Sequence, residues 1–70
     1  MFYVRFTIKD YTTKEKRIKT SEKYNNIDMA LEVVDRYLSR QKNYINIESL
    51  GNNKTLVQKF GGEILVEVLQ

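Results

Sequence analysis

Only one stretch of this chain, residues 26–42, repeats its apolar side chains with the period of a helix. At about 3.6 residues per turn, apolar side chains fall on one face of it and charged side chains on the other. The apolar face consists of Ile27, Ala30, Leu31, Val34, Tyr37 and Leu38. Asn25 or Asn26 can cap the start, because an Asn side-chain oxygen accepts a hydrogen bond from a free N–H of the first turn.

The remaining segments have the features of strands and turns. Phe2, Val4, Phe6 and Ile8 alternate with polar residues, which is the period of a strand with one buried face. A weaker strand is expected over residues 14–23, where many lysines are typical of a protected sheet edge. Three more strands are expected over residues 44–48, 56–60 and 63–69, with turns at Gly51-Asn52-Asn53 and Gly61-Gly62 between them.

This order of elements predicts the fold class. Residues 1–70 are too few for two hydrophobic cores, so we expect one small α+β domain. A single helix packs on one face of a four- to five-stranded sheet, in the order ββαβββ. The same order fits a β-grasp arrangement, in which the first and last strands run parallel in the middle of the sheet. That analogy concerns the fold and carries no function.

The expected core depends on the register of the last two hairpins. Pairing Ile45 with Phe60, and Phe60 with Ile64, places one apolar set on the helix side. That set is Ile45, Ile47, Leu56, Phe60, Ile64, Val66 and Val68. The first two strands are expected to add Phe2, Val4, Phe6, Ile8 and Ile18.

The composition argues against catalysis and metal binding. The chain has no Cys and no His, which removes disulfides, the usual zinc ligands and the commonest general base. The serines lack the surroundings of a nucleophile elbow. Asp28, Glu32 and Asp35 share one helix face that has the character of a solvated surface. We therefore expect a protein that is not an enzyme and has no cofactor and no metal.

No membrane segment is expected. No run approaches the roughly 20 apolar residues of a membrane span, and the first residues lack the pattern of a signal peptide. The sequence therefore predicts a cytoplasmic location.

The leading functional hypothesis is association with a protein. One helix covers one face of a sheet, yet the last strand is apolar on both sides. The uncovered face, or the edge of the last strand, is expected to contact another protein or a second copy of the chain. The expected interface residues are Val57, Leu65, Leu69, Leu50 and Tyr44. The plain alternative is that these are scattered surface residues without a role, which is common.

The second hypothesis is a nucleic-acid-binding module. The net charge is +3, and residues 1–24 hold seven Lys or Arg against three Asp or Glu. The first hairpin is expected to gather Tyr3, Arg5, Lys9, Arg17 and Lys19 on its outer surface. Such a surface can stack bases and neutralise phosphates, or attract an acidic partner, although no RNP-like motif is present. Ordinary solubilising charge is the alternative explanation.

Overall fold

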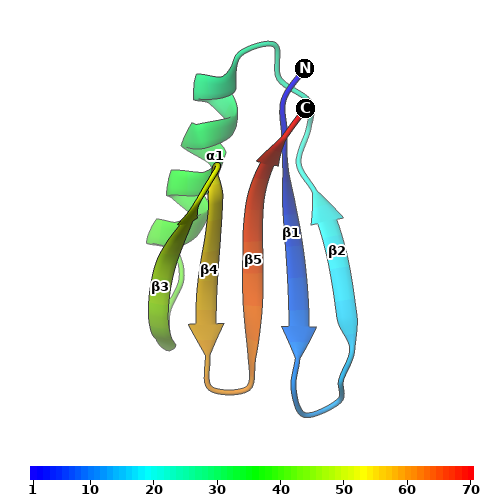
Figure 1. Ribbon diagram of the computed structural model, residues 1–70, viewed down its shortest axis with the longest axis vertical. Coiled ribbons are helices and arrows are strands. Elements are labelled where there is room, and N and C mark those ends of the chain that lie inside the picture. The colour runs from blue at the N-terminus through cyan, green and yellow to red at the C-terminus, as the bar shows by residue number, and fades with distance from the viewer.

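The helix begins directly after Asn26, one of the two residues that the sequence offers as its cap. The computed structural model describes residues 1–70 and places helix α1 over Ile27–Ser39 (Figure 1). Asn26 is the cap, since its Oδ1 accepts the backbone N–H of Asp28 at 2.7 Å. Ala30 is fully buried, and Val34 and Leu38 pack against the core, as the apolar face predicts.

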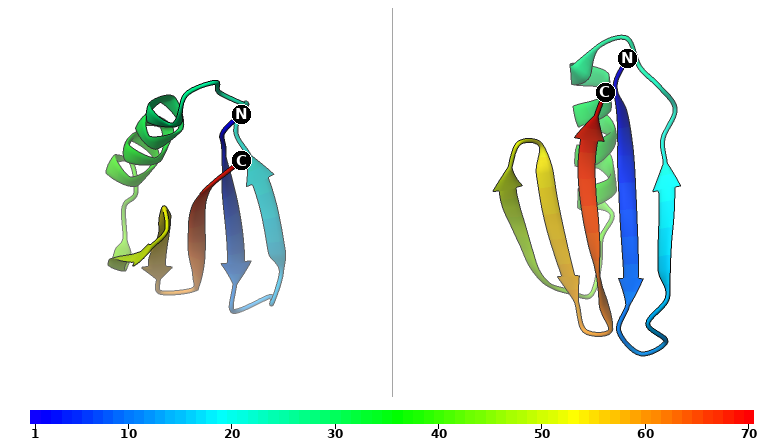
Figure 2. Two further views of the ribbon diagram at one scale, coloured as in Figure 1. Left: turned by 45° about the horizontal axis from the view of Figure 1, so that its top comes forward. Right: turned by 45° about the vertical axis from the view of Figure 1, so that its right-hand side comes forward.

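Five strands form one antiparallel sheet, which confirms the α+β class and the ββαβββ order (Figure 1). The sheet order is β2-β1-β5-β4-β3. The strands are β1 (Tyr3–Asp10), β2 (Lys16–Thr20), β3 (Tyr44–Gly51), β4 (Lys54–Lys59) and β5 (Gly62–Leu69). Helix α1 lies on one face, where its backbone approaches β1 and β5 but not β2, β3 or β4 (Figure 2).

The β-grasp arrangement is not what the chain adopts. The first and last strands, β1 and β5, are indeed neighbours in the middle of the sheet, but they run antiparallel. The direction follows from the connections. Helix α1 carries the chain back along the sheet, so that β3 runs in the direction of β2, and two tight turns then give β5 the direction of β3 (Figure 1).

The register expected for β3 and β4 is wrong by one residue. Gly51 pairs with Lys54 around a turn of Asn52 and Asn53, whose φ angles of 52° and 58° suit a tight hairpin. The register then shifts, which leaves Leu50 without a partner, and Ile47 pairs with Val57. Val57 therefore lies in the core with 0% exposure, and its expected place on the outer surface is wrong.

The turn between β4 and β5 is also shorter than expected. Lys59 pairs with Gly62, so only Phe60 and Gly61 form the connection. Phe60 is 85% exposed at the tip of this hairpin and does not belong to the core. Ile45 lies at a second register shift and is likewise exposed, while Leu56 faces away from the helix beside Leu65.

The second strand is turned over relative to the expectation. Thr7 pairs with Ile18, and because Thr7 faces away from α1, so does Ile18, which is 58% exposed rather than part of the core. The connection from Asp10 to Lys16 includes Lys14 at a φ of 62°, and the strand β2 is shorter than the expected residues 14–23.

The core lies between α1 and the sheet. Its buried apolar residues are Val4, Ala30, Val57, Ile64 and Val66.

Candidate functional site

The face of the sheet opposite α1, here called the outer face, is not covered by the helix (Figure 2). Strand pairing aligns Ile18 of β2, Thr7 of β1, Leu65 of β5 and Leu56 of β4 across four neighbouring strands. We call these four residues the apolar row. Ile18 is 58% exposed, Leu65 and Leu56 are partly exposed, and Thr7 is the one polar and buried member. Directly opposite residues on paired strands point to the same face, so the row is continuous. No other element of the chain covers it.

A charged cluster flanks one side of the apolar row. Arg5 donates from Nη2 and Nε to Glu67 Oε1 at 2.9 and 3.2 Å, and Lys54 Nζ lies 3.7 Å from Glu67 Oε2. The Glu67 side chain is only 6% exposed although it sits on an uncovered face. Two cations bracket this carboxylate, so its desolvation is compensated by charge-assisted hydrogen bonding.

A second set of charges flanks the other side of the row. Lys9 pairs across the sheet with Lys16 on β2 and with Glu63 on β5. The Tyr11 hydroxyl donates to Glu63 Oε1 at 2.6 Å, which ties the first hairpin turn to β5. This hydrogen bond to an anionic acceptor raises the pKa of Tyr11 above its usual 10.0, because the phenol proton is held in place.

The predicted interface residues fall in three places. Leu65 and Leu69 lie on the outer face as expected, since their partners on β1 are Thr7 and Tyr3. Leu50 and Tyr44 are about half exposed and belong to the edge strand β3. Val57 is in the core.

Two residues of the apolar row, Leu56 and Ile18, are missing from the predicted interface. The sequence places both in the core: Leu56 through the expected pairing of the last two hairpins, and Ile18 because it is the only large aliphatic residue of β2. A signal for β4 was present in Gly51, since a glycine at positive φ commonly accompanies an extra residue in a strand.

The five residues of the predicted basic surface do not share one face. Tyr3, Arg5 and Lys9 lie on the outer face, where Arg5 is held by Glu67. Arg17 and Lys19 pair with Ile8 and Phe6, which pack against the core, so these two cations lie on the helix side of the sheet. The expected nucleic-acid surface of the first hairpin is therefore split.

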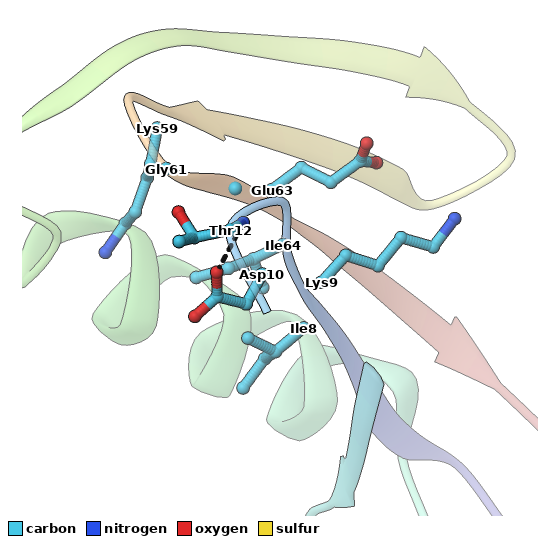
Figure 3. A pocket seen from close by; sticks show the side chains of 9 residues that line it. Ile8, Lys9, Asp10, Thr12, Lys59, Gly61, Glu63 and Ile64 are labelled. Atoms are coloured by element: carbon cyan, nitrogen blue, oxygen red, sulfur yellow. Dashed lines mark hydrogen bonds between the residues drawn. The ribbon is translucent and has the colours of Figure 1, made fainter. Parts of the chain in front are cut away.

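A hollow of about 360 Å³ lies where the β1–β2 and β4–β5 turns meet (Figure 3). Lys9, Asp10, Thr12 and Lys59 line part of it. The Asp10 carboxylate is already engaged, since it accepts the backbone N–H groups of Thr12 and Thr13 at 2.9 and 3.3 Å. This hollow is therefore explained by turn geometry and holds no base paired with a nucleophile.

Neither a metal cluster nor a membrane helix is found. No three Asp or Glu side chains gather where they could hold a metal ion. The one helix, α1, is not long and apolar enough to cross a membrane.

Comparison with known proteins gives no match: no family model, no curated protein and no solved structure matches the chain. The functional proposals therefore rest on the surfaces of the molecule itself.

Proposed function

We propose that this chain is a small non-catalytic binding module that acts by protein–protein association, with a second copy of itself on the outer face. The observation that carries the proposal is the apolar row, in which Ile18 is exposed and Leu65 and Leu56 are partly exposed, on a sheet that one helix covers from one side only. A domain of 70 residues buries a small core, and association is a common way for such domains to gain stability. The cytoplasmic location expected from the sequence stays part of this proposal.

The outer face carries a basic strand beside an acidic strand, so that the outer faces of two copies can have complementary charges. The outer side of β1 is basic through Arg5 and Lys9, and the outer side of the neighbouring β5 is acidic through Glu67 and Glu63. A twofold axis that runs between β1 and β5 places each β1 on the β5 of the other copy. Arg5 then faces Glu67 of the second copy, and Lys9 faces Glu63, which favours this pairing over others.

The same axis also superimposes the apolar row on itself. Ile18 of one copy then meets Leu56 of the other, and Leu65 meets Thr7. Such a contact uses the same patch on both copies, as closed twofold dimers do, and two sheets pack face to face with their strands roughly 30° apart. Leu50 and Tyr44 lie toward the β3 edge, beyond this contact, and their role in an interface stays a prediction.

Sedimentation velocity and light scattering test the proposal with a matched pair of variants. We expect the wild-type chain to form a dimer whose population rises with concentration. Leu65→Lys places a charge in the apolar row and is expected to give a monomer with an unchanged circular dichroism spectrum. Phe60→Lys makes the same change at an exposed hairpin tip, and this control is expected to remain a dimer.

Charge reversal tests the twofold arrangement itself. Glu63→Lys is expected to weaken the dimer, and adding Lys9→Glu is expected to restore it. A wild-type chain that stays monomeric at every concentration contradicts the proposal, as does equal behaviour of Leu65→Lys and Phe60→Lys.

A further inference from the structure

A second concave surface lies on the helix side of the sheet, between α1 and β2. Helix α1 approaches β1 and β5 and leaves this side of β2 uncovered (Figure 2). A hollow of about 270 Å³ results, lined by Phe6, Tyr24, Val33, Arg36, Tyr37 and Arg40. Lys19 of β2 does not line the hollow, but it pairs with Phe6 and therefore points to the same face of the sheet, beside it. We call this surface, with Lys19 included, the basic groove.

The basic groove carries cations without carboxylates. None of its lining residues is acidic. The three salt bridges of the molecule are made by Arg5, Arg17 and Lys54, so Lys19, Arg36 and Arg40 have no carboxylate oxygen within 4.0 Å.

The helix acids lie beside the groove rather than in it. At 3.6 residues per turn, Asp28 and Asp35 lie on the flank away from Arg40, whereas Glu32 lies one turn before Arg36. Glu32 forms no salt bridge with Arg36, so both guanidinium groups of the groove are free to meet an anion.

Aromatic rings form the floor and one end of the groove. The Phe6 and Tyr37 rings lie 4.5 Å apart between centroids, tilted by 40°. Tyr24 is fixed by two backbone hydrogen bonds of 2.7 Å with Phe2. All three rings are partly exposed. Burial raises the pKa of Tyr37, against a smaller opposing effect of Gln41, so its phenol stays neutral at physiological pH.

We propose that the basic groove binds a single strand of nucleic acid, with phosphates on Arg36, Arg40 and Lys19 and a base against Tyr37 or Tyr24. A cationic groove lined with aromatic rings is the arrangement that proteins use for single strands without sequence preference. Guanidinium groups suit phosphate because they donate two hydrogen bonds in a plane. An acidic peptide would account for the cations but leave the aromatic floor unused. The groove lies on the face opposite the dimer contact and does not depend on it.

Fluorescence anisotropy with a labelled oligo(dT) tests this proposal. We expect binding at low salt that weakens steeply as salt is added. Arg36→Glu is expected to lower the affinity about tenfold or more and to reduce the slope of log K against log salt by about 0.7, the value for one lost contact to a single strand. Lys14→Glu changes the net charge equally in the β1–β2 turn and is expected to have a much smaller effect.

The aromatic floor has its own test. Tyr37→Leu is expected to lower the affinity about tenfold with the salt slope unchanged, because stacking on a ring releases no counterions. If circular dichroism shows that Tyr37→Leu does not fold, Tyr24→Leu takes its place with the same expected result.

Three results would overturn the proposal. The first is no binding of oligo(dT) by the wild-type chain at low salt. The second is an equal effect of Arg36→Glu and Lys14→Glu, which would mean attraction to the overall charge alone. The third is displacement of the oligonucleotide by polyglutamate at an equal concentration of charge, which would assign the groove to acidic proteins.

Discussion

At the scale of residues, one unpaired side chain decides which side of β4 is buried. Next to the turn, the pairing of Gly51 with Lys54 continues the register in which Ile45 would pair with Phe60. Ser49 then pairs with Thr55, so Leu50 has no partner on β4 and the register shifts by one residue. Since side chains alternate along a strand, a shift of one residue turns the whole strand over. The extra Leu50 thereby sends Val57 into the core and Leu56 to the outer face.

A single glycine also fixes how closely two strands approach. Gly62 is buried, and a Cβ atom there would collide with the carbonyl oxygen of Lys9, whereas a Cβ at Gly61 meets nothing within 4 Å. Gly62→Ala is therefore expected to lower the free energy of unfolding by about 1–3 kcal/mol, because β1 must move. Gly61→Ala is the control and is expected to change it by less than about 0.5 kcal/mol. Urea unfolding measures both, and equal effects would contradict the close approach of β1 and β5.

The hydrogen bond from Tyr11 to Glu63 predicts a change of stability with pH. The pKa of Tyr11 is raised in the folded state, so its contribution is complete below the ordinary value of 10.0 and is lost as the pH rises through the folded-state pKa. The wild-type chain is therefore expected to lose more stability above pH 10.0 than Tyr11→Phe does. Urea midpoints across pH measure this difference. Tyr44→Phe, which removes an exposed phenol without this bond, should follow the wild type.

At the scale of elements, the two edge strands are protected differently. All five residues of β2 are exposed, and its two lysines and one arginine discourage pairing with other strands. Strand β3 carries a single charged residue, Glu48, and exposes Tyr44, Ile45 and Leu50. Its two register shifts interrupt the regular pairing and in this way blunt an otherwise open edge.

The orientation of β4 can be tested by two truncations. Val57→Ala removes buried carbon from the core and is expected to lower the free energy of unfolding by about 2 kcal/mol. Leu56→Ala acts on the partly exposed outer face and is expected to lower it by about 1 kcal/mol or less. Urea unfolding at low protein concentration, where the dimer does not contribute, compares them. A larger loss of unfolding free energy for Leu56→Ala than for Val57→Ala would instead support the register expected from the sequence.

At the scale of the whole molecule, one helix on a five-stranded sheet leaves two different surfaces open. The outer face offers apolar side chains flanked by complementary charges. The side of β2 beyond α1 offers aromatic rings and unpaired cations. These surfaces lie on opposite faces of the sheet, so one partner on each can bind at the same time.

This separation predicts independent variants. Leu65→Lys is expected to abolish the dimer while oligo(dT) affinity stays within about twofold of the wild type, since no groove residue lies on the outer face. Arg36→Glu is expected to lower the oligo(dT) affinity and to leave the dimer intact. Sedimentation and anisotropy on both variants measure the two properties together, and loss of both properties in either variant would contradict separate surfaces.

The sequence by itself determined the elements that depend on local order. The helix with a cap at Asn25 or Asn26, the alternation in β1 and β5 and the turn after Gly51 all follow from the nature and spacing of neighbouring residues. The structure selects Asn26 as the cap. Leu65 and Leu69 could be placed on the outer face for the same reason.

Only the tertiary structure decided how the strands align. The extra residue at Leu50 and the two-residue turn at Phe60-Gly61 each shift an expected pairing by an odd number of residues, and the pairing of Ile18 with Thr7 puts Ile18 on the outer face. Alternation within a strand is unchanged by such shifts, so the strand pattern alone cannot reveal them. The apolar row and the basic groove bring together residues from several strands and the helix, and their composition is therefore set by register rather than by any local pattern.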